Sequence, residues 1–175
     1  MARRRMRFAL LALLFGFAPA VLAGTLDGKK NEWAFDISWT DVDNVGSVTN
    51  VDGEWSYIFG KGMNEFGLFL SYLSEDPDTG SSQDAMIMGP AYTWNWMPAK
   101  KATGYINVGY GFVSGDMGDF FDTGWQASIG AKVFVGDSAA VRIQYFMTSL
   151  MGSEGVDDLD SNGIAIGISI FTGNK

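Results

Sequence analysis

The chain has 175 residues, with no cysteine, no histidine, 23 glycines and a formal net charge of −8. This length suits a single domain. Absence of cysteine excludes a disulfide framework and a thiolate metal site, and absence of histidine excludes an imidazole ligand, general base or pH switch. The acidic balance argues against a nucleic-acid partner, because duplex binding depends on clustered Lys and Arg.

The first 23 residues have the pattern of a secretory signal peptide. Four arginines between residues 3 and 7 precede an apolar run from 8 to 15, and Val21-Leu22-Ala23 supplies a small-residue cleavage site. The apolar run is too short for the ~20 residues of a membrane-spanning helix. Cleavage after Ala23 leaves 8 basic and 20 acidic residues, a net charge of −12. We expect residues 24–31 to form a short periplasmic segment and residues 32–175 to form the folded domain.

Eight stretches of about ten residues follow, each alternating a large apolar side chain with a small or polar one. A period of two residues predicts β-strands. The large side chains, in chain order, are Trp33, Phe35, Ile37 and Trp39; Trp55, Tyr57 and Phe59; Phe66, Leu68, Leu70 and Tyr72; Met86, Met88, Tyr92, Trp94 and Trp96; Ile106, Val108, Tyr110 and Phe112; Trp125, Ala127, Ile129, Ala131 and Val133; Val141, Ile143, Tyr145 and Met147; and Ile164, Ile166, Ile168 and Ile170.

An even number of such strands can close into an antiparallel barrel without edges. A soluble barrel would need a charged outer coat, whereas the small face here is mostly Gly, Ala, Ser, Thr, Asn and Gln. The large face carries no charge, and each stretch matches the ~9–11 residues that cross a bilayer. The sequence therefore predicts an all-β, eight-stranded antiparallel up-and-down transmembrane barrel with its large side chains in lipid. The alternative is a secreted β-sandwich.

Aromatic residues should mark the two membrane interfaces. We expect Trp33, Phe59, Phe66, Trp94 and Trp96 near one rim, and Trp39, Trp55, Tyr72, Phe112 and Trp125 near the other.

The connections are expected to alternate between short and long. Short turns are expected around Gly60 to Asn64, Met97 to Ala102 and Gly136 to Ser138, and long loops over Asp41 to Gly53, Ser74 to Asp84, Gly115 to Asp122 and Ser149 to Asn162. Short periplasmic turns and long external loops are typical of bacterial outer-membrane barrels. In this layout the chain resembles the small eight-stranded outer-membrane barrels of the OmpA and OmpX type over about residues 32 to 171. Such proteins usually end on an aromatic residue, whereas here four residues follow Phe171.

Four charged residues are assigned to the interior, namely Asp36, Glu54, Lys132 and Arg142. Buried charges need partners, so we predict salt bridges among these two acids and two bases that plug the lumen. The alternative, a conducting or proton-relaying path, fits less well, because an eight-stranded barrel has room for little more than its own side chains.

The expected long loops are acidic and contain no Lys or Arg. Their acids are Asp41, Asp43, Asp52, Glu75, Asp76, Asp78, Asp84, Asp116, Asp119, Asp122, Glu154, Asp157, Asp158 and Asp160. The surface is either a solvated, repulsive coat or a binding site for Ca²⁺ or Mg²⁺. Asp158, Asp160 and Asn162 match the opening of a calcium loop, but the Glu expected later in that motif falls on Ser169. No other cofactor is expected.

Three functions remain open. The first is a non-enzymatic surface protein of the outer membrane, acting through its acidic loops on an extracellular ligand or host surface. The second is a channel or transporter for small or apolar solutes, through the lumen or a lateral opening near Pro90. The third, a lipid-modifying enzyme, is disfavoured because a Ser-His-acid triad is impossible without histidine. Expected partners are outer-membrane lipid and the barrel-insertion machinery, with the protein as a monomer.

Overall fold

The computed structural model describes residues 25–42, 46–77, 81–98 and 100–174, so the expected signal peptide lies outside the described residues. Eight strands make up most of the described chain, with two short 3₁₀ turns, η1 (Gly60–Gly62) and η2 (Asp116–Asp119). The strands are β1 (Lys29–Val42), β2 (Gly46–Phe59), β3 (Asn64–Pro77), β4 (Gln83–Trp96), β5 (Ala102–Ser114), β6 (Phe121–Gly136), β7 (Ala139–Gly152) and β8 (Leu159–Asn174). No helix in this part of the chain is long and apolar enough to cross a membrane.

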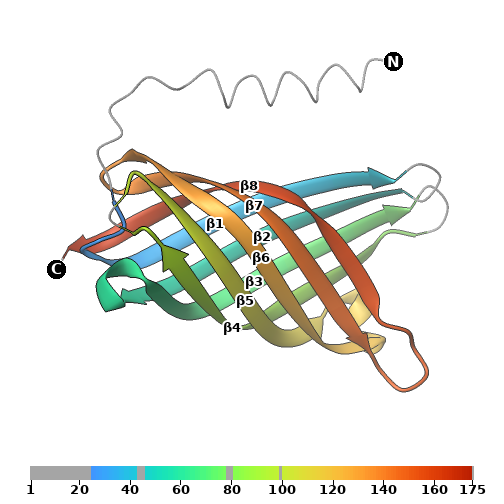
Figure 1. Cartoon of the computed structure of the whole chain (residues 1–175). Coiled ribbons are helices and arrows are strands. Elements are labelled where there is room, and N and C mark those ends of the chain that lie inside the picture. The colour runs from blue at the N-terminus through green and yellow to red at the C-terminus, as the bar shows by residue number, and fades with distance from the viewer. Residues whose placement is uncertain (1–24, 43–45, 78–80, 99, 175) are drawn as a thin grey trace, which may run out of the picture.

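Each strand pairs antiparallel with the next, and β8 pairs with β1 to close the barrel (Figure 1). The predicted eight-stranded up-and-down barrel is therefore confirmed. If paired residues are followed from strand to strand around the wall, starting at Glu32 on β1, the path arrives at Ser161 on β8. Glu32 itself pairs with Phe171, which is also on β8. This offset of ten residues is the shear of the barrel, and it fixes the strong strand tilt seen in Figure 1.

The two faces of the wall divide as the alternation predicts. Large apolar side chains from every strand are exposed on the outside, among them Phe35, Leu68 and Ile168 at 50%, 57% and 51%. Small, polar and a few aromatic side chains fill the inside. An exposed apolar band of this extent requires a lipid solvent rather than water, so we treat the strands as membrane-spanning.

The end of the barrel where β1 begins and β8 ends is called the terminal end, and the opposite one the loop end. At the terminal end the connections 60–63, 97–101 and 137–138 are short, as expected. At the loop end the connections are 43–45, 78–82, 115–120 and 153–158. The expected loop Gly115 to Asp122 nearly matches the third of these, whereas the other three expected loops are too long, because the strands continue into those segments. Backbone pairing continues in polar sequence because the ladder itself needs no apolar side chains.

The register also corrects one interface residue. Trp55 pairs directly with Trp33, and their ring centroids lie 6.4 Å apart. The two rings therefore lie at the same level near the terminal end. Trp55 was expected at the opposite rim because β2 was expected to begin after Gly53, whereas the strand begins seven residues before that glycine.

The wall is tightly closed beside Pro90, where a lateral opening had been considered. The pairing between β4 and β5 passes from Met88 with Phe112 to Ala91 with Gly109 and skips Gly89 and Pro90. Even so, a Cβ built on Gly89 would meet the carbonyl oxygen of Tyr110 and would come within 2.6 Å of the Cα of Gly111. The two backbones thus approach too closely for a solute to pass between them.

This close approach predicts that Gly89→Ala destabilises the barrel by about 1–3 kcal/mol, the usual cost of overpacking. The comparison is Gly53→Ala, because a Cβ at Gly53 meets nothing closer than 4.0 Å. Unfolding by guanidinium in lipid vesicles measures both changes. Equal stabilities for the two variants would mean that the wall at Pro90 is loose.

Candidate functional site

The interior is closed at the terminal end by an apolar cluster. Its buried members are Leu26, Ile58, Phe134, Ala140 and Phe171. The rings of Phe134 and Phe171 stack with centroids 5.1 Å apart. Leu26 comes from the segment before β1 and donates its backbone N–H to the carbonyl of Pro98 at 3.0 Å. The chain preceding the first strand therefore helps to seal this end.

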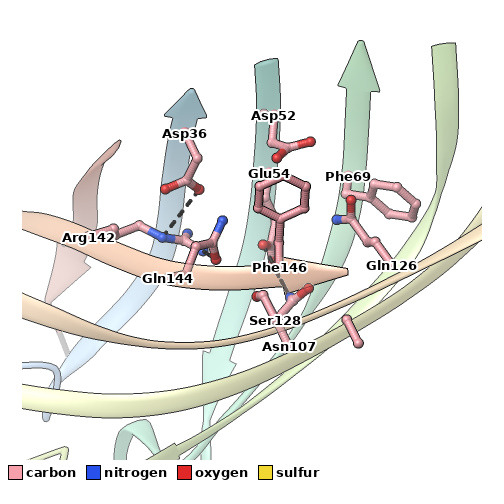
Figure 2. A pocket seen from close by; sticks show the side chains of 12 residues that line it. Asp36, Asp52, Glu54, Phe69, Asn107, Gln126, Ser128, Arg142, Gln144 and Phe146 are labelled. Atoms are coloured by element: carbon pink, nitrogen blue, oxygen red, sulfur yellow. Dashed lines mark hydrogen bonds and ion pairs between the residues drawn. The ribbon is translucent and has the colours of Figure 1, made fainter. Parts of the chain in front are cut away.

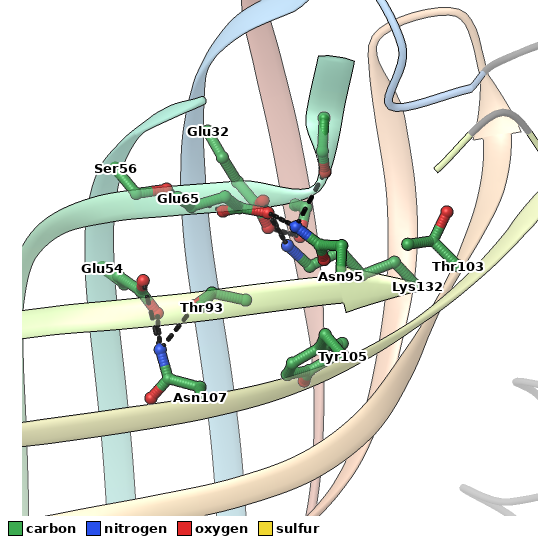
Figure 3. A network of polar contacts seen from close by, with 12 residues as sticks. Glu32, Glu54, Ser56, Glu65, Thr93, Asn95, Thr103, Tyr105, Asn107 and Lys132 are labelled. Carbon is green, nitrogen blue, oxygen red and sulfur yellow. Dashed lines mark hydrogen bonds and ion pairs between the residues drawn. The ribbon is translucent and has the colours of Figure 1, made fainter. Parts of the chain in front are cut away.

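Next to this cluster lies a buried ionic cluster built around Lys132. Lys132 Nζ lies 2.5 Å from Glu32 Oε2 and 2.7 Å from Glu65 Oε1, and all three side chains are at most 2% exposed (Figure 3). Glu65 also accepts hydrogen bonds from Ser56 Oγ at 2.8 Å and Asn95 Nδ2 at 2.6 Å, and Glu32 Oε1 accepts one from Ser169 Oγ at 2.5 Å. Both carboxylates that contact Lys132 are thus held by further donors, as buried charges require.

The second base, Arg142, pairs directly with Lys132 across β6 and β7, so two positive charges are neighbours in the ladder. Glu32 lies between them, with Oε2 on Lys132 and Oε1 3.4 Å from Arg142 Nη1. The ring of Tyr105 lies 5.1 Å from Lys132 Nζ and 4.9 Å from Arg142 Cζ. A shared carboxylate and an aromatic face together offset the repulsion between the two bases.

Beyond Arg142 lies a small cavity of about 20 Å³, lined mainly by polar residues of five strands (Figure 2). Arg142 Nε reaches Asp36 Oδ2 at 3.4 Å. Glu54 accepts hydrogen bonds from Asn107 Nδ2 at 3.3 and 3.4 Å. Asp52 accepts one from Asn50 Nδ2 at 3.1 Å. The volume holds about one water-sized species, which is too small for a solute pathway.

A second apolar cluster fills much of the interior toward the loop end. It is formed by Phe69, Leu73, Ala85, Ile87, Ala91, Met117, Phe121 and Leu150. Met117 belongs to η2, so the 115–120 connection folds inward over the lumen. Beside this cluster a cleft of about 210 Å³ opens, lined by Val48, Leu73, Glu75, Thr148, Leu150, Leu159, Asp160, Ser161 and Asn162.

The structure brings together three of the four predicted interior charges. Asp36, Lys132 and Arg142 belong to one ion-pair network, whereas Glu54 bonds to Asn107 and has no ion pair with a described Lys or Arg. The expected balance of two acids and two bases is wrong, since the described interior also contains Glu32, Glu65 and Asp52.

Sequence reasoning missed these three acids for different reasons. Glu32 and Glu65 stand at the ends of expected strands, although each has the inward parity of its strand. Asp52 was assigned to a loop, but it lies in β2 and is only 9% exposed. Extending the alternation by two or more residues at each strand end would have identified all three.

The predicted calcium-loop residues are not gathered around a point. Asp158 Oδ1 accepts the backbone N–H of Gly152, Asn162 Oδ1 accepts the hydroxyl of Tyr145, and Asp160 and Asn162 lie on β8. Side chains two residues apart on a strand are separated by about 7 Å. Within the described ranges, no group of three or more His, Cys, Asp or Glu residues is placed to hold a metal ion. Asp43 and Asp78, two of the expected loop acids, lie outside the described residues.

No protein-family model and no curated protein sequence matches the chain. Among solved structures, the crystal structure of Neisserial surface protein A (NspA) is similar, with a TM-score of 0.61 at 11% identity, covering 82% of this chain and 95% of that one. A structure from the de novo design of transmembrane β-barrels gives a TM-score of 0.48 at 16% identity, covering 85% and 99%. The outer membrane enzyme PagL gives 0.47 at 12% identity, covering 79% and 98%. The likeness to NspA shows that the chain has the fold of a small outer-membrane barrel, and at this identity it shows the fold alone.

Removing Lys132 should leave the buried Glu65 without a counter-ion and leave Glu32 with Arg142 as its one remaining described base. We expect Lys132→Met to destabilise the barrel by about 3–5 kcal/mol, the range for breaking a buried pair. Adding Glu65→Gln to that variant should recover part of the loss, because one orphaned charge is removed. Guanidinium unfolding measures both, with exposed Lys100→Met as the control near zero. A Lys132→Met loss no larger than that of Lys100→Met would show that the ionic cluster contributes nothing to stability.

Proposed function

We propose that the protein is a non-conducting, non-enzymatic barrel of the outer membrane whose loop end presents an acidic surface to partners outside the cell. The observation that carries this proposal is the separation of charge between the two ends. The described acids at the loop end are Glu75, Asp76, Asp84, Asp116, Asp119, Asp122, Glu154, Asp157, Asp158 and Asp160. No Lys or Arg accompanies them in the described part of that end.

The terminal end has the opposite character. Its described bases are Lys29, Lys30, Lys61, Lys100 and Lys101, and the acids near them are Asp27 and Asp137. Because fields from like charges add over a surface, the loop end attracts cations and basic partners and repels anionic ones. Since β1 enters and β8 leaves at the terminal end, a periplasmic position for that end fits the layout of outer-membrane barrels.

The interior supports a closed rather than a conducting barrel. An apolar cluster closes the terminal end, the buried ionic cluster lies next to it, and the cavity beyond is about 20 Å³. A solute crossing the lumen would have to break the ion pairs of Lys132 and Arg142 and displace Phe134 and Phe171. The close backbone contact at Gly89 argues against a lateral route.

The residue inventory supports a non-enzymatic role. The chain contains neither His nor Cys, so neither a Ser-His-acid triad nor a thiolate nucleophile can be assembled. The interior carboxylates pair with Lys132 and Arg142 or accept hydrogen bonds from amide and hydroxyl groups. They lie inside a closed barrel, to which a lipid substrate has no access. The partners that this proposal requires are outer-membrane lipid, the insertion machinery and a basic surface outside the cell.

Conductance tests the closed interior directly. Purified protein in planar bilayers should give no stable current steps, because the ionic and apolar clusters leave no continuous aqueous path. A large-lumen porin recorded in the same bilayers provides the positive control. Reproducible unitary currents from folded protein would contradict the proposal and favour the channel.

Neutralising the acidic end tests the surface role. We expect Asp116→Asn, Asp119→Asn, Glu154→Gln and Asp157→Asn, combined in one variant, to reduce attachment of expressing cells to a poly-lysine surface several-fold, because electrostatic steering depends on these charges. Rising salt should weaken the attachment of the unsubstituted protein in the same direction.

The control is Asp137→Asn, which removes an exposed acid from the turn between β6 and β7 at the terminal end. Its attachment should equal that of the unsubstituted protein, and all three proteins should insert equally, as judged by heat-modifiable mobility on gels. Undiminished attachment of the quadruple variant would exclude the acidic end as the contact surface.

A further inference from the structure

We propose that the cleft at the loop end binds a small organic ammonium ion whose apolar part is about the size of a benzene ring. The inference goes beyond the surface role, which needs only a field of like charges, because it assigns a defined site and a defined ligand chemistry. The cleft has a volume of about 210 Å³ and is lined by β2 and β3 on one side and by β7 and β8 on the other.

The cleft lies where the first and last strands of the wall part. Backbone pairing of β1 with β8 stops at Ile37 and Ile166, although both strands continue toward the loop end (Figure 1). From there on, β8 pairs with β7 alone among the described residues. Because no paired strand covers this edge, a ligand reaches the cleft from the mouth and need not enter the lumen. Four residues of the free edge line the cleft, namely Leu159, Asp160, Ser161 and Asn162.

The floor of the cleft is apolar and closed. Val48, Leu73, Leu150 and Leu159 line it. Leu73 and Leu150 are only 4% and 1% exposed and belong to the apolar cluster that fills the interior toward this end, so the cleft does not continue into the lumen. An apolar cavity of about 150 Å³ holds benzene. The cleft therefore admits one such ring or a short alkyl chain and is too small for a lipid.

The charges of the lining select a cation. Glu75, which is half-buried, and Asp160, which is exposed, both line the cleft, and its described lining contains no Lys or Arg. A metal ion does not fit, because no group of three or more acids is placed to hold one in the described ranges. An organic ammonium ion suits both parts of the lining, because its nitrogen can bond to the carboxylates while its hydrocarbon lies on the apolar floor.

A buried hydroxyl supplies an independent observation that points to a ligand. Thr148 lines the cleft and is only 3% exposed, yet its Oγ1 has no hydrogen-bond partner within the described chain. An unpaired buried hydroxyl is costly. An N–H of a bound ammonium group, donated to Thr148 Oγ1, removes that cost. The site therefore favours a primary ammonium ion over a fully alkylated one.

The experiment uses full-chain protein, purified folded in detergent and titrated calorimetrically with benzylammonium chloride, with protein-free micelles as the reference. We expect one saturable site per chain and a rise in melting temperature at saturation, because the ligand binds only the folded barrel. Benzyl alcohol, which keeps the ring without the charge, should bind about tenfold more weakly or worse, since hydrogen bonds to charged groups are the stronger ones. Benzoate should not bind.

Two variants separate the contributions of charge and hydroxyl. Glu75→Gln should weaken benzylammonium binding several-fold, because one of the two carboxylates is lost. Thr148→Val should weaken it about tenfold and leave binding of benzyltrimethylammonium unchanged, because that ion has no N–H to donate. Without ligand, Thr148→Val should melt no lower than the unsubstituted protein, since it removes an unpaired buried hydroxyl. The matched control is Asp137→Asn, an exposed acid at the terminal end, which should leave the site intact.

If Thr148→Val does not fold, Leu159→Trp tests the same site, because this exposed residue can carry a larger side chain that fills the cleft and should abolish binding. Absence of a saturable site, equal binding of benzyl alcohol and benzylammonium, or unchanged affinity in both Glu75→Gln and Thr148→Val would each overturn the proposal. Binding of a lysine-rich peptide without binding of free benzylammonium would also overturn it. The surface role is tested separately, because the quadruple variant retains Glu75, Thr148 and Asp160.

Discussion

The separation of side chains by size across a single closed sheet is the constraint on which the rest of the structure depends. Every strand has one face in lipid and one in a narrow interior, so large apolar and small polar residues must alternate without a slip of register. Closure pairs the backbone of β8 with β1, which satisfies the polar groups that a bilayer cannot solvate. The same closure and the ten-residue shear limit the interior to the space that its own side chains occupy.

A narrow interior makes each buried charge consequential. Lys132 and Arg142 are forced into neighbouring positions by the register of β6 and β7, and Glu32, on β1 with only β8 between it and β7, binds both. The cluster therefore joins strands that are distant in sequence, which local pairing alone cannot do. Where no opposite charge arrives, as at Asp52, the same register leaves a carboxylate oxygen without a partner.

The period of two was enough to predict the number of strands, their order and which face meets lipid, because these depend on local alternation. It could not predict where strands end, since polar residues such as those of β2 before Gly53 continue the ladder beyond the membrane. The missed interior acids follow from that error. Which acid meets which base was also beyond the sequence, because Glu32 and Lys132 lie 100 residues apart and meet only through the closure and shear of the barrel.

The two ends of the barrel differ in the residues that lie across the lumen. At the loop end, Glu75 and Asp160 line a cleft, and the apolar cluster that contains Leu73 and Leu150 lies beside it. At the terminal end, two buried bases and an apolar cluster stand across the lumen. A cation drawn to the mouth by the acidic field meets apolar side chains such as Phe69 and Met117, which cannot solvate it, while an anion is repelled by the same field. Acidic charge at the mouth and apolar clusters toward both ends thus support the proposed closed barrel for ions of both signs, without a moving part.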